Sequence, residues 1–151
     1  MTEALLERVS RACSAGKPFD AAAQEVCALL RKEVPRYNWI GVYMVDGKDS
    51  LLLKAWDGPK ATEHVRIPIS KGVCGAAVRE AQTIVVDDVK KDPRYLSCFL
   101  STRSEIVVPI FANGKVVGEI DIDSDKTAAF GDDDRRFLER AAAALASAYV
   151  D

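Results

Sequence analysis

Hydrophobic residues recur along the chain with two different periods. Over residues 2–15 and again over 20–34 they return every three or four positions, which predicts two helices that each bury one face. The same spacing returns over 132–149, where acidic residues open the segment as expected of a helix N-terminus. The pattern therefore predicts helices at both ends of the chain.

Between these helices the pattern changes to the period of two that is typical of strands. Residues 39–45 and 51–56 predict one hairpin, closed by the turn at 46–49. Residues 105–111 and 115–123 predict a second hairpin around an Asn-Gly turn. These hairpins are expected to form the centre of an antiparallel sheet.

Four shorter segments complete the predicted order of elements. Strands are expected at 64–67 and 83–86, a short helix at 73–80, and loops with helical turns over 87–104. Together the elements predict an α+β fold in which the terminal helices pack on one face of a central antiparallel sheet. The other face is then left to build a ligand pocket with the long loop.

Length and composition limit the possible classes of function. The 151 residues fit one domain, residues 1–151, which buries about two thirds of its unfolded surface. With 21 basic against 23 acidic residues, the formal net charge of −2 gives no basic surface for nucleic acid. No apolar run approaches the roughly 20 residues that span a bilayer, so we expect no membrane segment and a cytoplasmic location.

The four cysteines are too few and too widely spaced for a disulfide scaffold, and none forms a Cys-x-x-Cys pair. With a single histidine, His64, the chain also lacks the usual ligands of a zinc site, and no metal is expected. Cys13 and Cys27 lie on the buried faces of the first two predicted helices and are interpreted as core residues.

The other two cysteines lie in different surroundings. Cys74 stands between two glycines where a loop enters the predicted helix, a position where the helix N-terminus can lower a thiol pKa. Cys98 lies in the polar loop region, seven residues before Glu105. Each alone is more often inert, but two thiols outside the predicted core favour exchange chemistry.

Acidic side chains alternate along the predicted strand at 115–123, so Glu119, Asp121 and Asp123 share one face. Such alternation is ordinarily a solvated face. Alternatively the three acids form a cluster that binds an ammonium group, and exclusion of water would then raise a carboxyl pKa and create a proton donor. Glu105 begins the neighbouring strand, within reach of this cluster.

Two aromatic residues also share one face of a predicted strand. Trp39 and Tyr43 are four positions apart and share one face of their predicted strand. They are interpreted either as core residues or as an aromatic wall for a sulfur, methyl or cationic group.

Five short motifs make the sequence resemble a known family, and they cover nearly the whole chain: Asn38-Trp39-Ile40-Gly41-Val42-Tyr43, Val65-Arg66-Ile67-Pro68, Gly72-Val73-Cys74-Gly75, Cys98 through Ser104-Glu105-Ile106-Val107, and Asp121-Ile122-Asp123-Ser124. The chain resembles the free methionine-(R)-sulfoxide reductases, which are single GAF domains. The resemblance implies a GAF-like fold and reduction of free methionine sulfoxide.

By this resemblance, Cys98 attacks the sulfoxide sulfur and Cys74 resolves the product as a disulfide, although the two roles can be exchanged. Trp39 and Tyr43 match the aromatic wall of the family pocket. The acids that hold the substrate and assist protonation of its oxygen are matched by Glu105, Asp121 and Asp123. The resemblance also implies no bound cofactor, thioredoxin as the external reductant, and a homodimer formed through the terminal helices.

The chain departs from the family pattern at one position. The family usually carries a third cysteine just before the Val-Arg-Ile-Pro run, and His64 stands there instead. His64 is either a surface residue or a group that tunes a thiolate. The departure predicts a two-cysteine reductase or a relative that kept the pocket and lost efficient turnover. The alternatives are a GAF module that binds a small cationic metabolite without turnover, and a thiol redox sensor.

Overall fold

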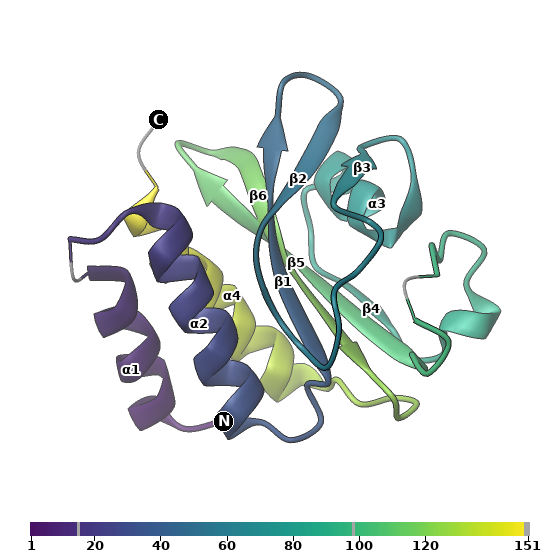
Figure 1. Cartoon of the computed structure of the whole chain (residues 1–151), viewed down its shortest axis with the longest axis horizontal. Coiled ribbons are helices and arrows are strands. Elements are labelled where there is room, and N and C mark those ends of the chain that lie inside the picture. Colours follow the sequence, from purple (N-terminus) through teal and green to yellow (C-terminus); the bar gives the residue numbers. More distant parts are fainter. Residues whose placement is uncertain (15, 98, 150–151) are drawn as a thin grey trace.

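The computed structural model describes residues 1–14, 16–97 and 99–149 and shows a six-stranded antiparallel sheet with helices on both faces (Figure 1). The helices are α1 (Glu3–Ser14), α2 (Phe19–Glu33), α3 (Gly72–Glu80) and α4 (Asp132–Ala148), with a 3-10 turn at Val89–Lys91. The strands are β1 (Trp39–Asp46), β2 (Ser50–Asp57), β3 (Arg66–Pro68), β4 (Ile84–Val86), β5 (Ser104–Ala112) and β6 (Lys115–Ser124). The predicted α+β fold is confirmed.

The sheet has the order β3-β2-β1-β6-β5-β4. Both predicted hairpins are present, as β1 with β2 and β5 with β6, and β6 joins them by pairing with β1. Helices α2 and α4 pack on one face of this sheet, while α1 packs mainly on these two helices (Figure 1). Helix α3 lies on the opposite face, against β5 and β6.

The terminal helices follow their hydrophobic pattern closely. The Thr2 hydroxyl accepts a hydrogen bond from the Leu5 backbone N–H at 3.1 Å, which caps the start of α1. Cys13 and Cys27 are buried in the core on the helical side of the sheet, as predicted. No helix in the three described stretches of chain has the length and apolar character needed to cross a membrane.

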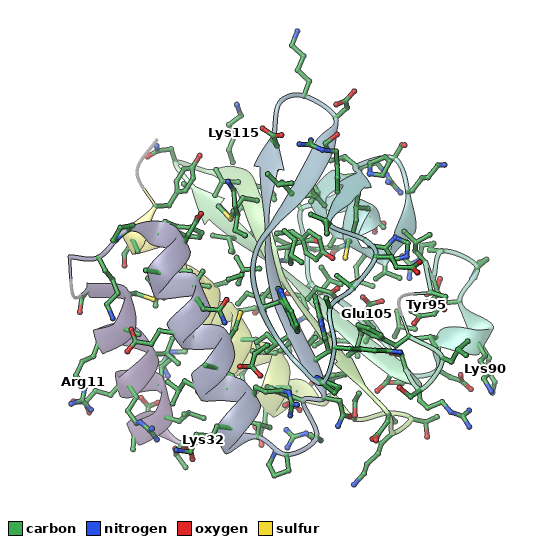
Figure 2. All side chains as sticks on the ribbon, in the orientation of Figure 1. Arg11, Lys32, Lys90, Tyr95, Glu105 and Lys115 are labelled. Carbon is green, nitrogen blue, oxygen red and sulfur yellow. The ribbon has the colours of Figure 1, made fainter. Side chains whose placement is uncertain are left out.

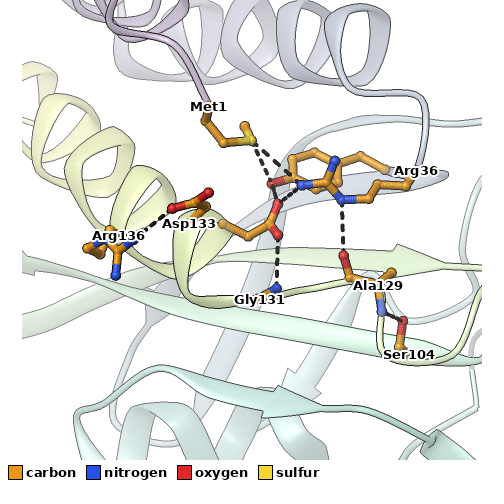
Figure 3. Close-up of polar contacts among 9 residues, drawn as sticks. Met1, Arg36, Ser104, Ala129, Gly131, Asp133 and Arg136 are labelled. Atoms are coloured by element: carbon orange, nitrogen blue, oxygen red, sulfur yellow. Dashed lines mark hydrogen bonds and ion pairs between the residues drawn. The ribbon is translucent and has the colours of Figure 1, made fainter.

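The start of α4 is tied to the segment before β1 by a buried carboxyl group (Figure 3). Asp134 accepts hydrogen bonds from the Tyr37 hydroxyl, from the Arg36 guanidinium and, at 2.9 Å, from the Gly131 backbone N–H. Arg36 Nε also donates to the Ala129 carbonyl at 3.0 Å. This network fixes the helical layer on the side of the sheet opposite to the acids of β6.

The third strand begins later than the sequence pattern predicts. Strand β3 starts at Arg66, and His64 lies in the loop before it. The His64 backbone N–H donates to the Thr62 hydroxyl at 3.0 Å, and its carbonyl accepts from the Tyr43 hydroxyl at 2.7 Å. Because side chains hold both backbone groups of His64, the residue does not join the strand ladder.

Candidate active site

Strand β6 divides its side chains between the two faces of the sheet. Ile120 and Ile122 enter the core beneath the helices. The alternating acids Glu119, Asp121 and Asp123 lie on the other face, where α3 packs. The acids are buried, with exposed fractions of 0% for Glu119, 1% for Asp121 and 2% for Asp123. The interpretation of this alternation as a solvated face is therefore wrong.

The register of the sheet brings the other predicted residues to the same place. Asp123 pairs with Trp39 on β1 and with Glu105 on β5, while Asp121 pairs with Gly41 on β1. Glu105 is 5% exposed and lies on the opposite side of the sheet from Arg11 and Lys32, which mark α1 and α2 (Figure 2). The hairpin of β5 and β6 thus supplies one buried acidic row, and β1 places Trp39 beside it.

Helix α3 places the Cys74 thiol beside this row. One ligand atom from each of Cys74, Glu105 and Asp121 lies within 4.8 Å of the other two. These three residues line a cavity of about 10 Å³ together with Ile67, Gly72, Val73 and Leu96. The cavity has room for about one water molecule, so an amino acid enters only when the surrounding side chains move.

Burial raises the pKa of three carboxyl groups in the row. Desolvation is the main reason that the pKa of Glu119 and that of Asp123 lie well above the ordinary value, and the negative charge of Asp121 raises both further. For Glu119, an interaction with the Cys74 thiol partly offsets the rise. The pKa of Asp121 is also raised by desolvation, and hydrogen bonding with Glu105 and Cys74 partly offsets this. Acids of this kind retain protons at higher pH than exposed carboxyl groups and can donate them.

The same surroundings act on the Cys74 thiol. Desolvation raises its pKa well above the ordinary value, and the charges of Asp121, Glu119 and Glu105 raise it further. The prediction that the helix N-terminus lowers this pKa is wrong, because burial and nearby acids outweigh the favourable amides of α3. Cys74 is 6% exposed and belongs to the core on this face, so its predicted position outside the core is wrong too.

Trp39 and Tyr43 lie on the same face of the sheet, as predicted from their spacing. Trp39 stacks against Trp56 with ring centroids 6.4 Å apart and an interplanar angle of 12°, and its ring lies 5.9 Å from that of Phe99. Tyr43 is fully buried on the same face. Both residues belong to the core on this face, and Trp39 also lines a cavity together with Asp123, whereas a role of the pair as a wall for a ligand stays a prediction.

A second cavity, of about 50 Å³, opens at the Trp39 end of the row. Asp123 Oδ2 accepts a hydrogen bond from the Thr102 hydroxyl at 3.4 Å there. Phe99 and Lys60 also line this cavity, and the Lys60 ammonium lies 5.8 Å from the centroid of the Phe99 ring. The acidic row thus links one cavity beside the thiol with another beside the indole.

His64 lies close enough to influence the site. Its Nε2 is 2.9 Å from the Ser97 carbonyl, which can only accept, so Nε2 carries the proton in this contact. A positive charge on His64 lowers the pKa of Asp121. The structure therefore connects His64 with a carboxyl group of the row, and tuning of a thiolate by His64 stays a prediction.

Cys98 lies outside the described residues, so its predicted approach to Cys74 and its role as nucleophile stay predictions. The sequence pattern placed Glu119 in the acidic cluster, although the family resemblance matched only Asp121 and Asp123 of that strand. Sequence reasoning did not select Thr102, Phe99 and Lys60, for which the pattern gave no signal.

The trio Cys74, Glu105 and Asp121 offers one sulfur and two oxygen atoms, donors that a divalent metal accepts. Structural zinc sites use four ligands that are mostly cysteine and histidine. The carboxyl pKa values in the row are raised, and metal binding requires deprotonated ligands. The arrangement fits an acid and thiol site for a cationic ligand better than a metal centre.

Comparisons with known proteins agree with this architecture. Residues 18–149 match the GAF domain family. The GAF domain-containing protein A of Dictyostelium discoideum is 37% identical over 107 residues, which cover 71% of this chain and 66% of that protein. The free methionine-R-sulfoxide reductase of Escherichia coli is 35% identical over 141 residues, which cover 93% of this chain and 84% of that protein.

Among solved structures, the free methionine-R-sulfoxide reductase of Neisseria meningitidis in complex with its substrate is similar, with a TM-score of 0.88. It is 34% identical in sequence, and the alignment covers 94% of this chain and 84% of that chain. The similarity thus extends over the acidic row, the aromatic wall and α3.

Proposed function

The chain belongs to the GAF domain family and, within it, to the free methionine-R-sulfoxide reductases, and from this membership we propose that it reduces free methionine-R-sulfoxide to methionine. The single observation that carries the proposal to this chain is the buried trio of Cys74, Glu105 and Asp121, with ligand atoms within 4.8 Å of one another. The trio places a thiol beside acids that can bind an ammonium group and supply a proton.

In the first step the Cys98 thiolate attacks the sulfoxide sulfur. The sulfur–oxygen bond of the substrate breaks and the oxygen is transferred to Cys98, which becomes a sulfenic acid. Methionine is then released. The substrate sulfur gains two electrons and Cys98 loses them. The proton that the oxygen requires comes from a carboxyl group of the row, for which Asp121 and Glu105 lie beside the Cys74 cavity.

Substrate binding itself can release this proton. An ammonium group favours the ionised form of a neighbouring carboxyl group and lowers its pKa. Asp121 and Asp123 have raised pKa values, so an arriving ammonium group favours transfer of their protons to the sulfoxide oxygen. Trp39 and Tyr43 supply the apolar wall for the thioether part of the substrate.

In the second step Cys74 attacks the sulfenic acid. A disulfide bond forms between the two cysteines, and the hydroxyl group leaves as water with the proton of the Cys74 thiol. A dithiol then reduces this disulfide and becomes oxidised itself; we propose thioredoxin for this reductant. The absence of a bound cofactor, a homodimer through the terminal helices and a cytoplasmic location likewise remain proposals.

The test is a single turnover of the reduced protein with free methionine-R-sulfoxide or its S epimer, without a recycling reductant. Mass spectrometry follows methionine and, after thiol labelling, the cysteines. The proposal predicts one equivalent of methionine and a disulfide between Cys74 and Cys98 with the R epimer alone. Unchanged thiols and no methionine would overturn it.

Variants assign the two cysteines in the same experiment. Cys98→Ser is expected to form no methionine, whereas Cys74→Ser is expected to form one equivalent without a disulfide. Cys13→Ser is the matched control, since Cys13 is buried on the helical side of the sheet, and it should behave like the unmodified protein. The opposite pattern in these two variants would mean that Cys74 is the nucleophile and Cys98 the resolving cysteine.

One observation favours a second candidate, a module that binds a cationic metabolite without turnover. The raised pKa of Cys74 keeps its resting thiol protonated, and a protonated thiol is a poor nucleophile. Calorimetric binding of free methionine sulfoxide to the reduced protein, with no methionine formed when thioredoxin is present, would support the module.

A further inference from the structure

The proposed reaction leaves one charged group of the substrate without a binding partner. A free amino acid carries an α-carboxylate as well as an ammonium group, and any ionised acid of the row repels a carboxylate. Among the described residues that line the two cavities of the site, Lys60 alone has a cationic side chain. The cavity beside Trp39 is therefore the one in which the carboxylate meets a positive charge.

Two residues that line this cavity carry buried polar atoms without partners. Trp39 Nε1 can only donate, and it reaches no acceptor within the described chain; Asp123 Oδ1 likewise makes no hydrogen bond there. Trp39 and Asp123 are direct partners across β1 and β6, and each is 2% exposed. Leaving such groups unpaired costs free energy, so the two atoms together indicate a ligand that offers one acceptor and one donor.

Ring contacts bring the Lys60 ammonium to the same place as the indole. Lys60 Nζ lies 5.8 Å from the centroid of the Phe99 ring, and that ring lies 5.9 Å from the ring of Trp39. An added Cβ on Gly58 would lie 3.3 Å from Trp39 Nε1. The N–H edge of the indole therefore faces the segment that continues through Pro59 to Lys60.

We propose that Lys60 and the indole N–H of Trp39 bind the α-carboxylate of free methionine-R-sulfoxide, an assignment that rests on the proposed function. The Lys60 ammonium supplies the charge, and Trp39 Nε1 donates one hydrogen bond to the same carboxylate. Asp123 Oδ1 accepts from the α-ammonium group, which a carboxyl oxygen can do in either protonation state. The sulfoxide end of the substrate then extends along the acidic row toward Cys74.

The cavity of about 50 Å³ has room for one or two water molecules, so the lining has to open when the substrate enters. Pro59 and Lys60 are exposed, so this movement involves surface side chains and leaves the sheet in place. Asp125 also lines the cavity, but it is exposed and water screens its charge. The buried groups that stay fixed are Trp39 and Asp123.

This arrangement distinguishes a free amino acid from a methionine residue within a polypeptide. Such a residue carries a neutral amide in place of the carboxylate, and it gives Lys60 no anion to bind. A site built around a polar group of its substrate rejects analogues that lack the group much more strongly than an apolar pocket rejects a missing methylene group. Lys60 is thus expected to determine specificity and affinity, with little effect on the chemical step.

The first test measures binding by calorimetry in a reduced Cys98→Ser background, which is expected not to turn over. The ligands are free methionine-R-sulfoxide and its carboxamide, which keeps the ammonium group and lacks the carboxylate. Lys60→Gln should bind the free amino acid about tenfold to a hundredfold more weakly than the parent, and both should bind the carboxamide equally weakly. Lys90→Gln, a change at an exposed lysine on the 3-10 turn (Figure 2), is the matched control and should bind like the parent.

These binding data separate failure of the inference from failure of the proposed function, because they require no methionine to form. Equal affinity of Lys60→Gln and its parent for the free amino acid would overturn the inference, even if the unmodified protein forms methionine. A preference for the free amino acid that depends on Lys60 supports the carboxylate site, even if no methionine forms. Binding of neither ligand would overturn both proposals.

A second measurement follows the indole N–H itself. The chain has two tryptophans, so nuclear magnetic resonance of an isotope-labelled sample shows two indole N–H signals, and Trp39→Phe identifies that of Trp39 by its loss. Saturating free methionine-R-sulfoxide should shift the Trp39 proton signal downfield as its hydrogen bond forms, and the carboxamide should shift it less. A signal that stays in place while the ligand binds would overturn the assignment of Trp39.

Discussion

The indole of Trp39 lies against Gly41, where an added Cβ would come within 2.4 Å of Trp39 Cη2. An added Cβ on Gly58 would likewise come within 2.4 Å of Trp39 Cδ1. Two glycines thus leave the space in which the indole lies beside the acidic row. The aromatic wall depends on the absence of side chains at these positions.

Gly41→Ala is expected to displace the Trp39 ring and so weaken substrate binding. Overpacking of this kind costs about 1–3 kcal/mol, and misplacing a binding group raises KM by about tenfold to a hundredfold. Denaturant unfolding and steady-state kinetics measure the two effects. Gly131→Ala, where an added Cβ meets nothing within 4 Å, is the control. Unchanged KM in Gly41→Ala would contradict a role for this wall in binding.

Gly75→Ala is expected to move α3 and with it Cys74. An added Cβ on Gly75 would lie 2.3 Å from the carbonyl oxygen of Ile69, a backbone atom that cannot turn away as a side chain can. We expect the free energy of unfolding to fall by about 1–3 kcal/mol and the disulfide of Cys74 to form more slowly. Full stability together with an unchanged rate would show that the close packing of α3 does not position the thiol.

The stability of the protein without substrate is expected to decline as the pH rises above about 4. In the unfolded chain carboxyl groups titrate at about 4, and burial raises the pKa of Glu119, Asp121 and Asp123 in the folded chain. Between these pKa values the folded state binds more protons, so raising the pH favours unfolding. Each such group contributes at most about 1.4 kcal/mol per pH unit.

Asp123→Asn isolates one part of this pH dependence. Urea unfolding at several pH values should show a shallower decline in this variant, because one buried group no longer titrates. Asp133→Asn, a change at an exposed residue, is the control, and its stability should decline with pH as steeply as that of the unmodified protein. A steeper decline in Asp123→Asn would mean that the carboxyl group is ionised in the folded state.

Asp134→Ala should destabilise the fold without altering the acidic site. The change leaves the Tyr37 hydroxyl and the Gly131 backbone N–H without their acceptor, at a cost of about 2–4 kcal/mol. Asp133→Ala removes only an exposed ion pair with Arg136 and should cost at most about 1 kcal/mol. Thermal unfolding measures both; equal losses would show that the network in Figure 3 does not hold α4.

The amino-acid sequence by itself determined the order and type of the elements. Helical spacing in α1, α2 and α4 and alternation in β1 and β6 are local properties, because each records which face of an element is apolar. The alternation of Glu119, Asp121 and Asp123 with two isoleucines likewise predicted that the acids share a face.

Only the tertiary structure decided what that face contacts. An alternating sequence pattern does not tell whether the polar face of a strand is exposed to water or covered by another layer of the fold. Here α3 covers the acids and buries them. The same burial reverses the predicted pKa of Cys74, because desolvation depends on residues that are distant in the sequence. The influence of Glu119 on the Cys74 thiol likewise follows from the packing of α3 on β6, a contact between elements that local patterns do not specify.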